Sequence, residues 1–292
     1  MAPSEQGLPP GVTLRPLAAA DLPAACALSA EPGWNQIDAD WRLFLELGRT
    51  FLLLRDGKPI ATAATLPYAG FAWVSMVLVT KSEQRRGLAR FLLRHAIERL
   101  LAEGLRPVLD ATPAGRAVYL GLGFRDGWGM RRFVAQRLTP AGALAEPADG
   151  TRLRPLEPAD WPHLIAYDRA VFGAERGALL QRLAQRLPQA ALVAERGGKL
   201  AGYSLGRDGR VMDQLGPICA EDDAVAEALL SRALASLRAP LAIDVPDRQS
   251  RLAERLAALG FTIERSLTRM AHAGESPGSD PRYFAIAGPE LG

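Results

Sequence analysis

The sequence repeats itself, and this duplication constrains the fold more than any other feature. Three pairs of segments match in the same order along the chain: residues 14–17 with 153–156, 51–58 with 192–199, and 122–124 with 259–261. The offset between matching segments stays between 137 and 141 residues. Three matches in one order at nearly one spacing indicate that the chain contains two copies of one fold.

The repeat sets the expected domain boundaries. We predict one domain over residues 12–138 and another over 151–292, joined by a linker at 139–150 that is rich in Ala, Pro and Gly. Residues 1–11 carry neither a basic stretch nor an apolar run, so we expect a disordered amino-terminal segment and no secretory signal. The chain has 292 residues, which is long enough for each copy to build its own core.

Apolar periodicity predicts a similar order of elements in both copies. In the first copy we expect strands at 12–15, 50–55, 58–66, 72–79, 107–111 and 124–135, and helices at 21–29, 38–47, 87–102 and 114–121. In the second copy we expect helices at 160–172, 176–187, 222–237 and 249–258, a hairpin at 190–207, and strands at 241–245 and 261–271. Because strands alternate with helices in the later part of each copy, each copy is predicted to be an α/β fold with a mixed sheet.

Charge and cysteine usage argue against several classes of function. The 35 Lys and Arg residues are interspersed with 32 Asp and Glu residues, so no nucleic-acid-binding surface is indicated. Cys26 and Cys219 lie in unrelated segments and the three His residues lack ligand spacing, so we predict neither a disulfide framework nor a metal site. No apolar run approaches the ~20 residues that a membrane helix needs. We therefore expect a cytoplasmic protein that contacts no membrane, and its oligomeric state stays open.

The most informative stretch joins the strand that ends at Val79 to the helix that begins near Gly87. Its sequence is Gln84-Arg85-Arg86-Gly87-Leu88-Ala89. A loop that opens a helix directs several unpaired backbone N–H groups at one point, where the helix dipole adds positive potential. Small residues at positions 87 and 89 let a ligand approach the backbone, and the two arginines add charge. The sequence therefore predicts a pyrophosphate site.

Two motifs resemble those of the GNAT acetyltransferases. Residues 84–89 resemble the Gln/Arg-x-x-Gly-x-Gly/Ala signature of that family, and residues 110–124 resemble its second strand–helix unit, with the Tyr-x-x-x-Gly-Phe ending at Tyr119–Phe124. Residues 33–36, 40–41, 109–113 and 215–217 also look like the YitH-like bacterial subgroup of tandem GNAT proteins. The resemblance covers nearly the whole chain. It implies two GNAT folds, each a mixed, mostly antiparallel twisted sheet flanked by helices, and acetyl-CoA as the cosubstrate.

The second copy lacks the chemistry of this loop. When the copies are aligned on the following helix, residues 84–89 face Glu221-Asp222-Asp223-Ala224-Val225-Ala226. Two arginines are thus replaced by three carboxylates, which would repel a pyrophosphate, while acidic residues in a first turn stabilise a helix. Tyr119 aligns with Leu256. We therefore predict one acetyl-CoA per chain, bound by the first copy, and a degenerate second copy.

The resemblance also implies how the reaction proceeds. In GNAT enzymes a neutral amine attacks the thioester directly, and most of the rate comes from holding the reactants together. The backbone of Val77, Leu78 and Val79 would pair with the pantetheine arm, and the Leu78 amide would polarise the thioester carbonyl. Tyr119 is the candidate general acid that protonates the departing thiolate. The alternative is that Tyr119 only packs on its own helix.

The acceptor side leaves more alternatives open. Trp34, Asn35 and Trp41 resemble acceptor-pocket residues of the family, although core packing explains a tryptophan at helical spacing equally well. The candidate general bases are Glu31, Asp38, Asp40 and Asp110. Each of these carboxylates could instead be a surface charge or a helix cap, and water could also serve as the base. By the same resemblance Asp110 is also a candidate for substrate binding.

Five charged residues of the second copy are embedded in apolar segments: Asp168, Arg176, Arg207, Asp244 and Arg269. We expect them to form structural ion pairs, the alternative being a ring around an acceptor site. Taken together, the sequence predicts an N-acetyltransferase that acts on a primary amine of a small molecule. The alternatives are a non-catalytic acetyl-CoA sensor and a partner-binding protein.

Overall fold

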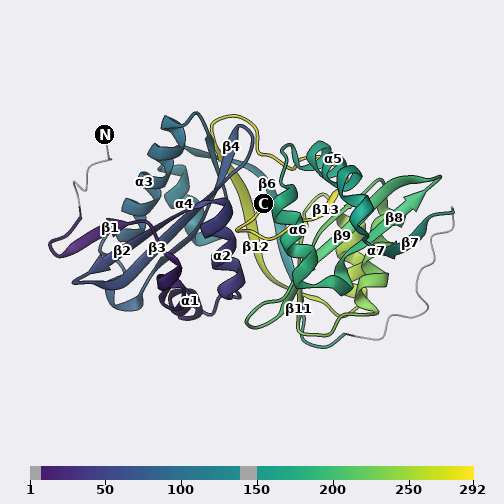
Figure 1. The fold of residues 1–292 in the computed structure, drawn as a ribbon, viewed down its shortest axis with the longest axis horizontal. Helices are drawn as coiled ribbons and strands as arrows, with labels where there is room; N and C mark the ends of the chain where they lie inside the picture. The colour runs from purple at the N-terminus through teal and green to yellow at the C-terminus, as the bar shows by residue number, and fades with distance from the viewer. Residues whose placement is uncertain (1–7, 139–149) are drawn as a thin grey trace. The chain divides into compact units, whose positions relative to one another are not determined.

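The computed structural model describes residues 8–138 and 150–292 of the chain (Figure 1). They form two compact units, residues 8–109 with Leu291, and residues 110–138 and 150–290 with Gly292. All of the predicted linker except Gly150 lies outside the described residues. The expected disorder of residues 1–11 does not extend to the last of them, because the carbonyl of Gly11 accepts a hydrogen bond from the amide of Asp56 (3.1 Å).

The first unit is a five-stranded mixed sheet with helices packed against it (Figure 1). Its strands, in sheet order, are β1 (Val12–Arg15), β2 (Arg49–Arg55), β3 (Lys58–Pro67), β4 (Phe71–Val79) and β5 (Arg106–Ala111). The first four strands run antiparallel, and β5 runs parallel to β4. The helices are α1 (Leu22–Ala30), α2 (Asp38–Leu47) and α3 (Leu88–Ala102), with short 3₁₀ turns at η1 (Ala19–Asp21) and η2 (Lys81–Glu83).

Local sequence accounts for the turns and helix starts that matter for the site. Asp56 and Gly57 both adopt positive φ angles (49° and 78°), which produces the tight hairpin between β2 and β3. The carboxylate of Asp40 accepts a hydrogen bond from the amide of Ile37 (2.8 Å) at the start of α2. Helix α3 packs on β3 and β4, so its first residues lie just beyond the end of β4.

The second unit is a larger sheet that contains the last strand of the first copy. Its strand order is β12-β6-β11-β10-β9-β8-β7, and β13 pairs with β10. The strand bounds are β6 (Phe124–Ala135), β7 (Arg152–Pro155), β8 (Leu192–Arg196), β9 (Lys199–Arg207), β10 (Asp213–Ala220), β11 (Leu241–Pro246), β12 (Thr262–His272) and β13 (Tyr283–Ala285). The helices are α4 (Pro113–Leu120), α5 (Trp161–Phe172), α6 (Gly177–Arg186), α7 (Asp223–Leu234) and α8 (Ser250–Ala258), with 3₁₀ turns η3 (Pro158–Asp160) and η4 (Pro188–Ala190).

Strand β6 explains why the compact units differ from the predicted domains. It lies between β11 and β12 and pairs antiparallel with both, with Phe133 opposite Ile243 and Met130 opposite Leu267. The last strand of the first copy is therefore built into the sheet of the second. The boundary between compact units consequently falls after Leu109, and the predicted linker marks only the junction of the two repeats.

The embedded charges of the second copy form ion pairs, as expected. Arg176 is bound to both carboxylate oxygens of Asp168 (2.9 Å each), and neither side chain is accessible to solvent beyond 1%. The other pairs are Arg132–Asp244 (2.7 Å), Arg269–Asp110 (2.9 Å) and Arg207–Glu290. The first two of these join residues of the first copy to residues of the second. Inside the second unit, ion pairs between the two copies thus accompany the insertion of β6 into the sheet of the second copy.

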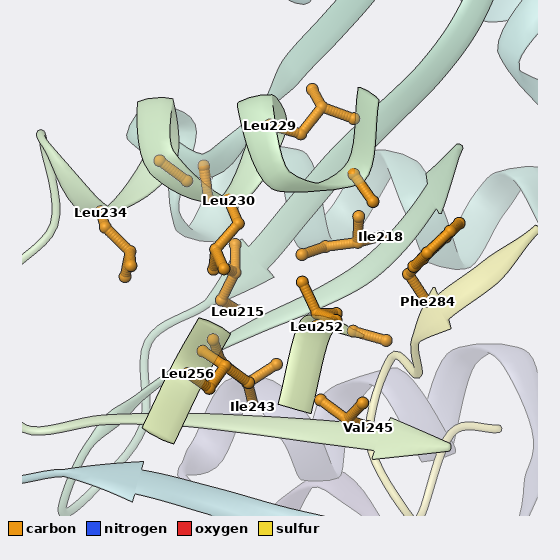
Figure 2. Close-up of a cluster of buried hydrophobic side chains, with 14 of the residues drawn as sticks. Leu215, Ile218, Leu229, Leu230, Leu234, Ile243, Val245, Leu252, Leu256 and Phe284 are labelled. Atoms are coloured by element: carbon orange, nitrogen blue, oxygen red, sulfur yellow. The ribbon is translucent and has the colours of Figure 1, made fainter. Parts of the chain in front are cut away.

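The core of the second unit is a large apolar cluster, part of which is shown in Figure 2. Leucines of α7 and α8 pack on side chains of β10 and β11, and Phe284 of β13 joins the same cluster. Strands β10 and β13 were not predicted as strands. The Gly216-Pro217 pair interrupts the apolar pattern of the sequence within β10, and β13 is too short to give a periodic pattern.

Truncating a buried side chain of this cluster should destabilise the protein. Leu230 on α7 is fully buried, so Leu230→Ala should lower the free energy of unfolding by about 2–5 kcal/mol, because it loses transfer free energy and leaves a cavity. Urea unfolding followed by circular dichroism measures the change. Ile263→Ala is the control, because Ile263 is 51% exposed, and an equal effect of both substitutions would contradict the assigned core.

Candidate active site

A bulge interrupts β4 just before the predicted phosphate loop. Ser75 lies opposite Ala64, but Leu78 lies opposite Thr62, so β4 contains one extra residue over this stretch. Within the bulge Met76 has a positive φ of 54°. Its carbonyl accepts a hydrogen bond from the hydroxyl of Thr62 (3.0 Å), which holds the bulge in place.

The bulge coincides with a separation of β4 from its other neighbour. Among the described residues, β4 pairs with β5 only over Phe71–Trp73. The following backbone, through Val77, Leu78 and Val79, is therefore not paired with β5, and we call this unpaired stretch the opening between the two strands. Val77 and Val79 are half-buried and Leu78 is buried. This opening is the edge where these three residues are predicted to pair with the pantetheine arm.

Two left-handed residues shape the loop that follows. Gln84 donates a hydrogen bond from Nε2 to the carbonyl of Val79 (3.1 Å), which ties the loop back to the strand. Arg85 and Gly87 have φ angles of 62° and 82°, and Gly87 is the residue that precedes the first turn of α3. A Cβ added to Gly87 would meet no protein atom within 4 Å, so the space in front of this turn is open.

The amino terminus of α3 has no side-chain cap. Leu88 and Ala89, its first two residues, accordingly present backbone N–H groups of the kind that bind anions. Arg85 and Arg86 are exposed beside this turn. The neighbouring Glu83 is buried and its carboxylate is paired with Arg55 (2.9 Å) and, more loosely, with Arg86 (3.6 Å). The local chemistry therefore fits the diphosphate of acetyl-CoA.

The equivalent turn of the second copy is capped by its own side chain. Asp222 accepts a hydrogen bond from the amide of Val225 (3.0 Å) at the start of α7 and forms an ion pair with Arg196 (2.8 Å). Both partners hold the pKa of the Asp222 carboxyl below its ordinary value, Arg196 more strongly. A carboxylate thus sits where the first copy leaves its helix terminus open.

The opening between strands of the second copy is also filled. Strand β10 pairs with β11 only at Asp213 and Gln214, which is the same arrangement as in the first copy. Beyond that point Ile218 and Cys219 of β10 pair with β13, and the amide of Ile286 donates to the carbonyl of Asp244 on β11 (3.0 Å). The chain itself occupies this opening. This insertion is not predicted from the sequence, although residues 283–287 form a visible apolar run.

The candidate general acid, Tyr119, lies on α4 in the second unit. Its ring is half-buried and packs edge-on against Phe124, with 6.0 Å between ring centroids. Burial raises the pKa of its hydroxyl above the ordinary value of 10.0, so the group stays protonated at neutral pH. The hydroxyl has no hydrogen-bond partner among the residues that the structure describes. Both properties suit a proton donor.

Three of the four predicted acceptor residues, Trp34, Asn35 and Trp41, differ in exposure. Trp41 is fully buried, and its Nε1 donates to the hydroxyl of Ser29 (3.3 Å), which supports the core-packing alternative for this residue. Asn35 is buried and Trp34 is half-buried. Both lie in the segment that connects α1 to α2, so these two remain the candidates for contact with an acceptor.

Each of the four candidate bases has a structural partner. Asp38 pairs with Arg42, Asp40 caps α2, and Asp110 binds Arg269 through both oxygens (2.9 Å each). Glu31 accepts hydrogen bonds from the loop that follows β4. The Asp110 side chain has no solvent exposure. Burial raises the pKa of its carboxyl, and the guanidinium of Arg269 opposes that rise.

Comparison with known proteins agrees with this geometry. Residues 17–124 match the model of the acetyltransferase (GNAT) family, and residues 164–284 match a second model described as an acetyltransferase (GNAT) domain. Between them the two matches span most of the chain. The chain therefore belongs to the GNAT family and carries two GNAT domains in tandem, and it is an acetyl-CoA-dependent acyltransferase. The predicted family, fold and enzyme class are confirmed.

Particular relatives cover nearly the whole length. YitH of Bacillus subtilis, described as an uncharacterized N-acetyltransferase, is 25% identical over 267 residues, which are 91% of this chain and 93% of YitH. A putative acetyltransferase from Pyrococcus horikoshii has a TM-score of 0.78 at 20% identity and covers 99% of both chains. A tandem GNAT protein from the clavulanic acid biosynthesis pathway has a TM-score of 0.68 at 18% identity, covering 89% of this chain and 98% of its own. The two structures support the fold.

Two further observations concern the part of the chain that the structure describes. It contains no cluster of three or more His, Cys, Asp or Glu residues suited to hold a metal ion. None of its helices combines the length and apolarity required to cross a membrane.

If Asp110 is a structural partner of Arg269, removing it should destabilise the protein. Asp110→Ala leaves a buried guanidinium without its carboxylate, and we expect a loss of about 3 kcal/mol in the free energy of unfolding. Thermal and urea unfolding measure this loss. Asp126→Ala is the matched control, because Asp126 and its partner Arg116 are exposed and such pairs contribute little. Unchanged stability of Asp110→Ala would return Asp110 to the candidates for acceptor binding.

Proposed function

We propose that this protein transfers the acetyl group of acetyl-CoA to the primary amine of a small molecule, using one cofactor site in its first copy. The observation that carries this proposal is the uncapped start of α3 behind Gly87, with open space in front of it. The same turn in the second copy is closed by Asp222. One copy thus offers a diphosphate site and the other does not.

Backbone and side-chain groups of the loop contribute differently to binding the cofactor. The backbone amides of Gly87, Leu88 and Ala89 hold the diphosphate, and the side chains of Arg85 and Arg86 supply charge around it. Gln84 keeps the loop attached to Val79. Upstream, the backbone of residues 77–79 pairs with the extended arm of the cofactor, and the amide of Leu78 donates to the thioester oxygen. When bound, acetyl-CoA supplies the acetyl group as a reactive thioester.

Tyr119 serves as the general acid in this proposal. A thiolate is a better leaving group when a nearby hydroxyl protonates it as the bond breaks. The hydroxyl of Tyr119 stays protonated because burial raises its pKa. The four carboxylates that were candidate bases are engaged by other groups, so water takes the proton from the acceptor amine.

The number of cofactor sites tests the proposal directly. Titration calorimetry of the full chain with acetyl-CoA should give one site per chain. Gly87→Trp should abolish binding, because an indole at a left-handed position fills the space in front of the loop. Asp222→Ala is the matched control in the second copy and should leave binding unchanged. Two equivalent sites, or binding that survives Gly87→Trp, would contradict the proposal.

Replacing the candidate acid should affect turnover and not binding. Tyr119→Phe keeps the ring packed on Phe124 but removes the proton, so kcat should fall on the order of 10²-fold while the Kd for acetyl-CoA stays the same. Since the pKa of Tyr119 is raised, the fold reduction should be equal at pH 7 and pH 9. Release of coenzyme A against a panel of small amines and lysine peptides measures turnover. An unchanged kcat would remove Tyr119 from the mechanism.

The same panel separates an enzyme from a sensor. An enzyme releases coenzyme A faster when a suitable amine is added, whereas a sensor binds acetyl-CoA without acceptor-dependent release. A preference for peptides over small amines would overturn the proposed substrate class and leave the acetyltransferase activity intact.

A further inference from the structure

Glu31 links two segments of the first unit that are far apart in sequence. It is the first residue after α1, and it begins the connection to α2 that carries Trp34 and Asn35. Its carboxylate accepts hydrogen bonds from the amide of Lys81 (3.2 and 3.3 Å to its two oxygens) and from the hydroxyl of Thr80 (3.3 Å). Thr80 and Lys81 are the first residues after β4, so they open the loop that leads to Gly87.

The position of this carboxylate at the end of α1 is electrostatically unfavourable. The carboxyl end of a helix carries partial negative charge, so a glutamate there is repelled by the helix dipole. The side chain is also exposed, so burial does not hold it in place. A residue that conflicts with its local element commonly serves another part of the structure. Here that part is the entrance to the phosphate loop.

We propose that Glu31 is a positioning residue that couples the acceptor-side segment, defined as residues 31–37, to the phosphate loop. This inference rests on the proposed function. The carboxylate accepts a hydrogen bond from the amide of Lys81 and thereby fixes the course of the backbone from β4 into η2. It also satisfies this donor upstream of the loop, so that the Lys81 amide does not compete with the amides at the start of α3 for an anion. A ligand that orders one segment thereby orders the other.

This role differs from that of a general base in what the side chain must retain. A base needs a carboxylate that takes up a proton, and a glutamine cannot replace it. A positioning residue needs only an oxygen that accepts the Lys81 amide, and the carboxamide of Glu31→Gln provides one. Glu31→Ala provides none. Comparison of the two substitutions therefore distinguishes the two roles.

The test measures acetyl-CoA affinity, acceptor kinetics and amide exchange in the full chain. In Glu31→Ala we expect the Kd for acetyl-CoA and the KM for the best amine of the panel to rise about 3- to 10-fold, with kcat within about 2-fold of wild type. Hydrogen exchange at the amide of Lys81 should accelerate in the protein without cofactor. In Glu31→Gln, the Kd for acetyl-CoA, the KM for the amine and the exchange rate of the Lys81 amide should stay closer to their wild-type values. Glu98→Ala, an exposed glutamate on α3, is the control and should change none of them.

Several outcomes would overturn the inference. A large loss of kcat in Glu31→Gln with unchanged acetyl-CoA affinity would make Glu31 the general base. Wild-type exchange at Lys81 and wild-type affinity in Glu31→Ala would show that the hydrogen bonds have no positioning role. Failure of the wild-type chain to bind acetyl-CoA would overturn the proposed function together with the coupling, whereas normal wild-type binding with an unaffected Glu31→Ala would overturn the coupling alone.

Discussion

The opening between the fourth and fifth strands of each copy is the constraint on which the rest of the structure depends. A bulge accompanies it at equivalent places, between Ser75 and Leu78 in the first copy and between Leu215 and Ile218 in the second. Backbone groups that border such an opening must find partners, because unpaired polar backbone is costly once it is shielded from water. The second copy meets this demand with β13. In the first copy the proposed partner is the extended arm of the cofactor.

The same logic applies to the helix that follows each opening. An α-helix leaves its first amides without intrahelical partners, and either a side chain or a ligand satisfies them. In α7 the carboxylate of Asp222 does so, with Arg196 beside it. In α3 a left-handed Gly87 replaces the capping side chain. The two copies thus differ at this turn by an acidic cap in α7 and a glycine with neighbouring arginines before α3. In the proposed function, this difference determines which copy binds the anion.

Sequence reasoning recovered most helices and strands because their apolar patterns were strong and their turns carried clear signals. Strand β6 begins and ends at the predicted residues, for example, and α2 does the same. The pairing of β6 between β11 and β12 was beyond reach, because the side chains of a strand record which faces are buried but not which strand lies alongside. For the site, the spacing of glycine and arginine predicted an anion loop at residues 84–89, and the structure places an uncapped helix start there. The contact between Glu31 and Lys81 was not predicted, because the two residues lie 50 positions apart in the sequence.

The insertion of β6 into the sheet of the second copy also brings the second copy into contact with the helix that carries Tyr119. Tyr119 lies on α4, which packs on β6 and on β12, a strand of the second copy. The ring of Phe124 lies between those of Tyr119 and His272, at centroid distances of 6.0 Å and 5.6 Å. Nearby, Asp110 is held by Arg269, also from β12. The second copy thus supplies packing partners to the helix that carries the candidate acid and a charge partner to Asp110, and in this way it would support the proposed reaction even if it binds no cofactor itself.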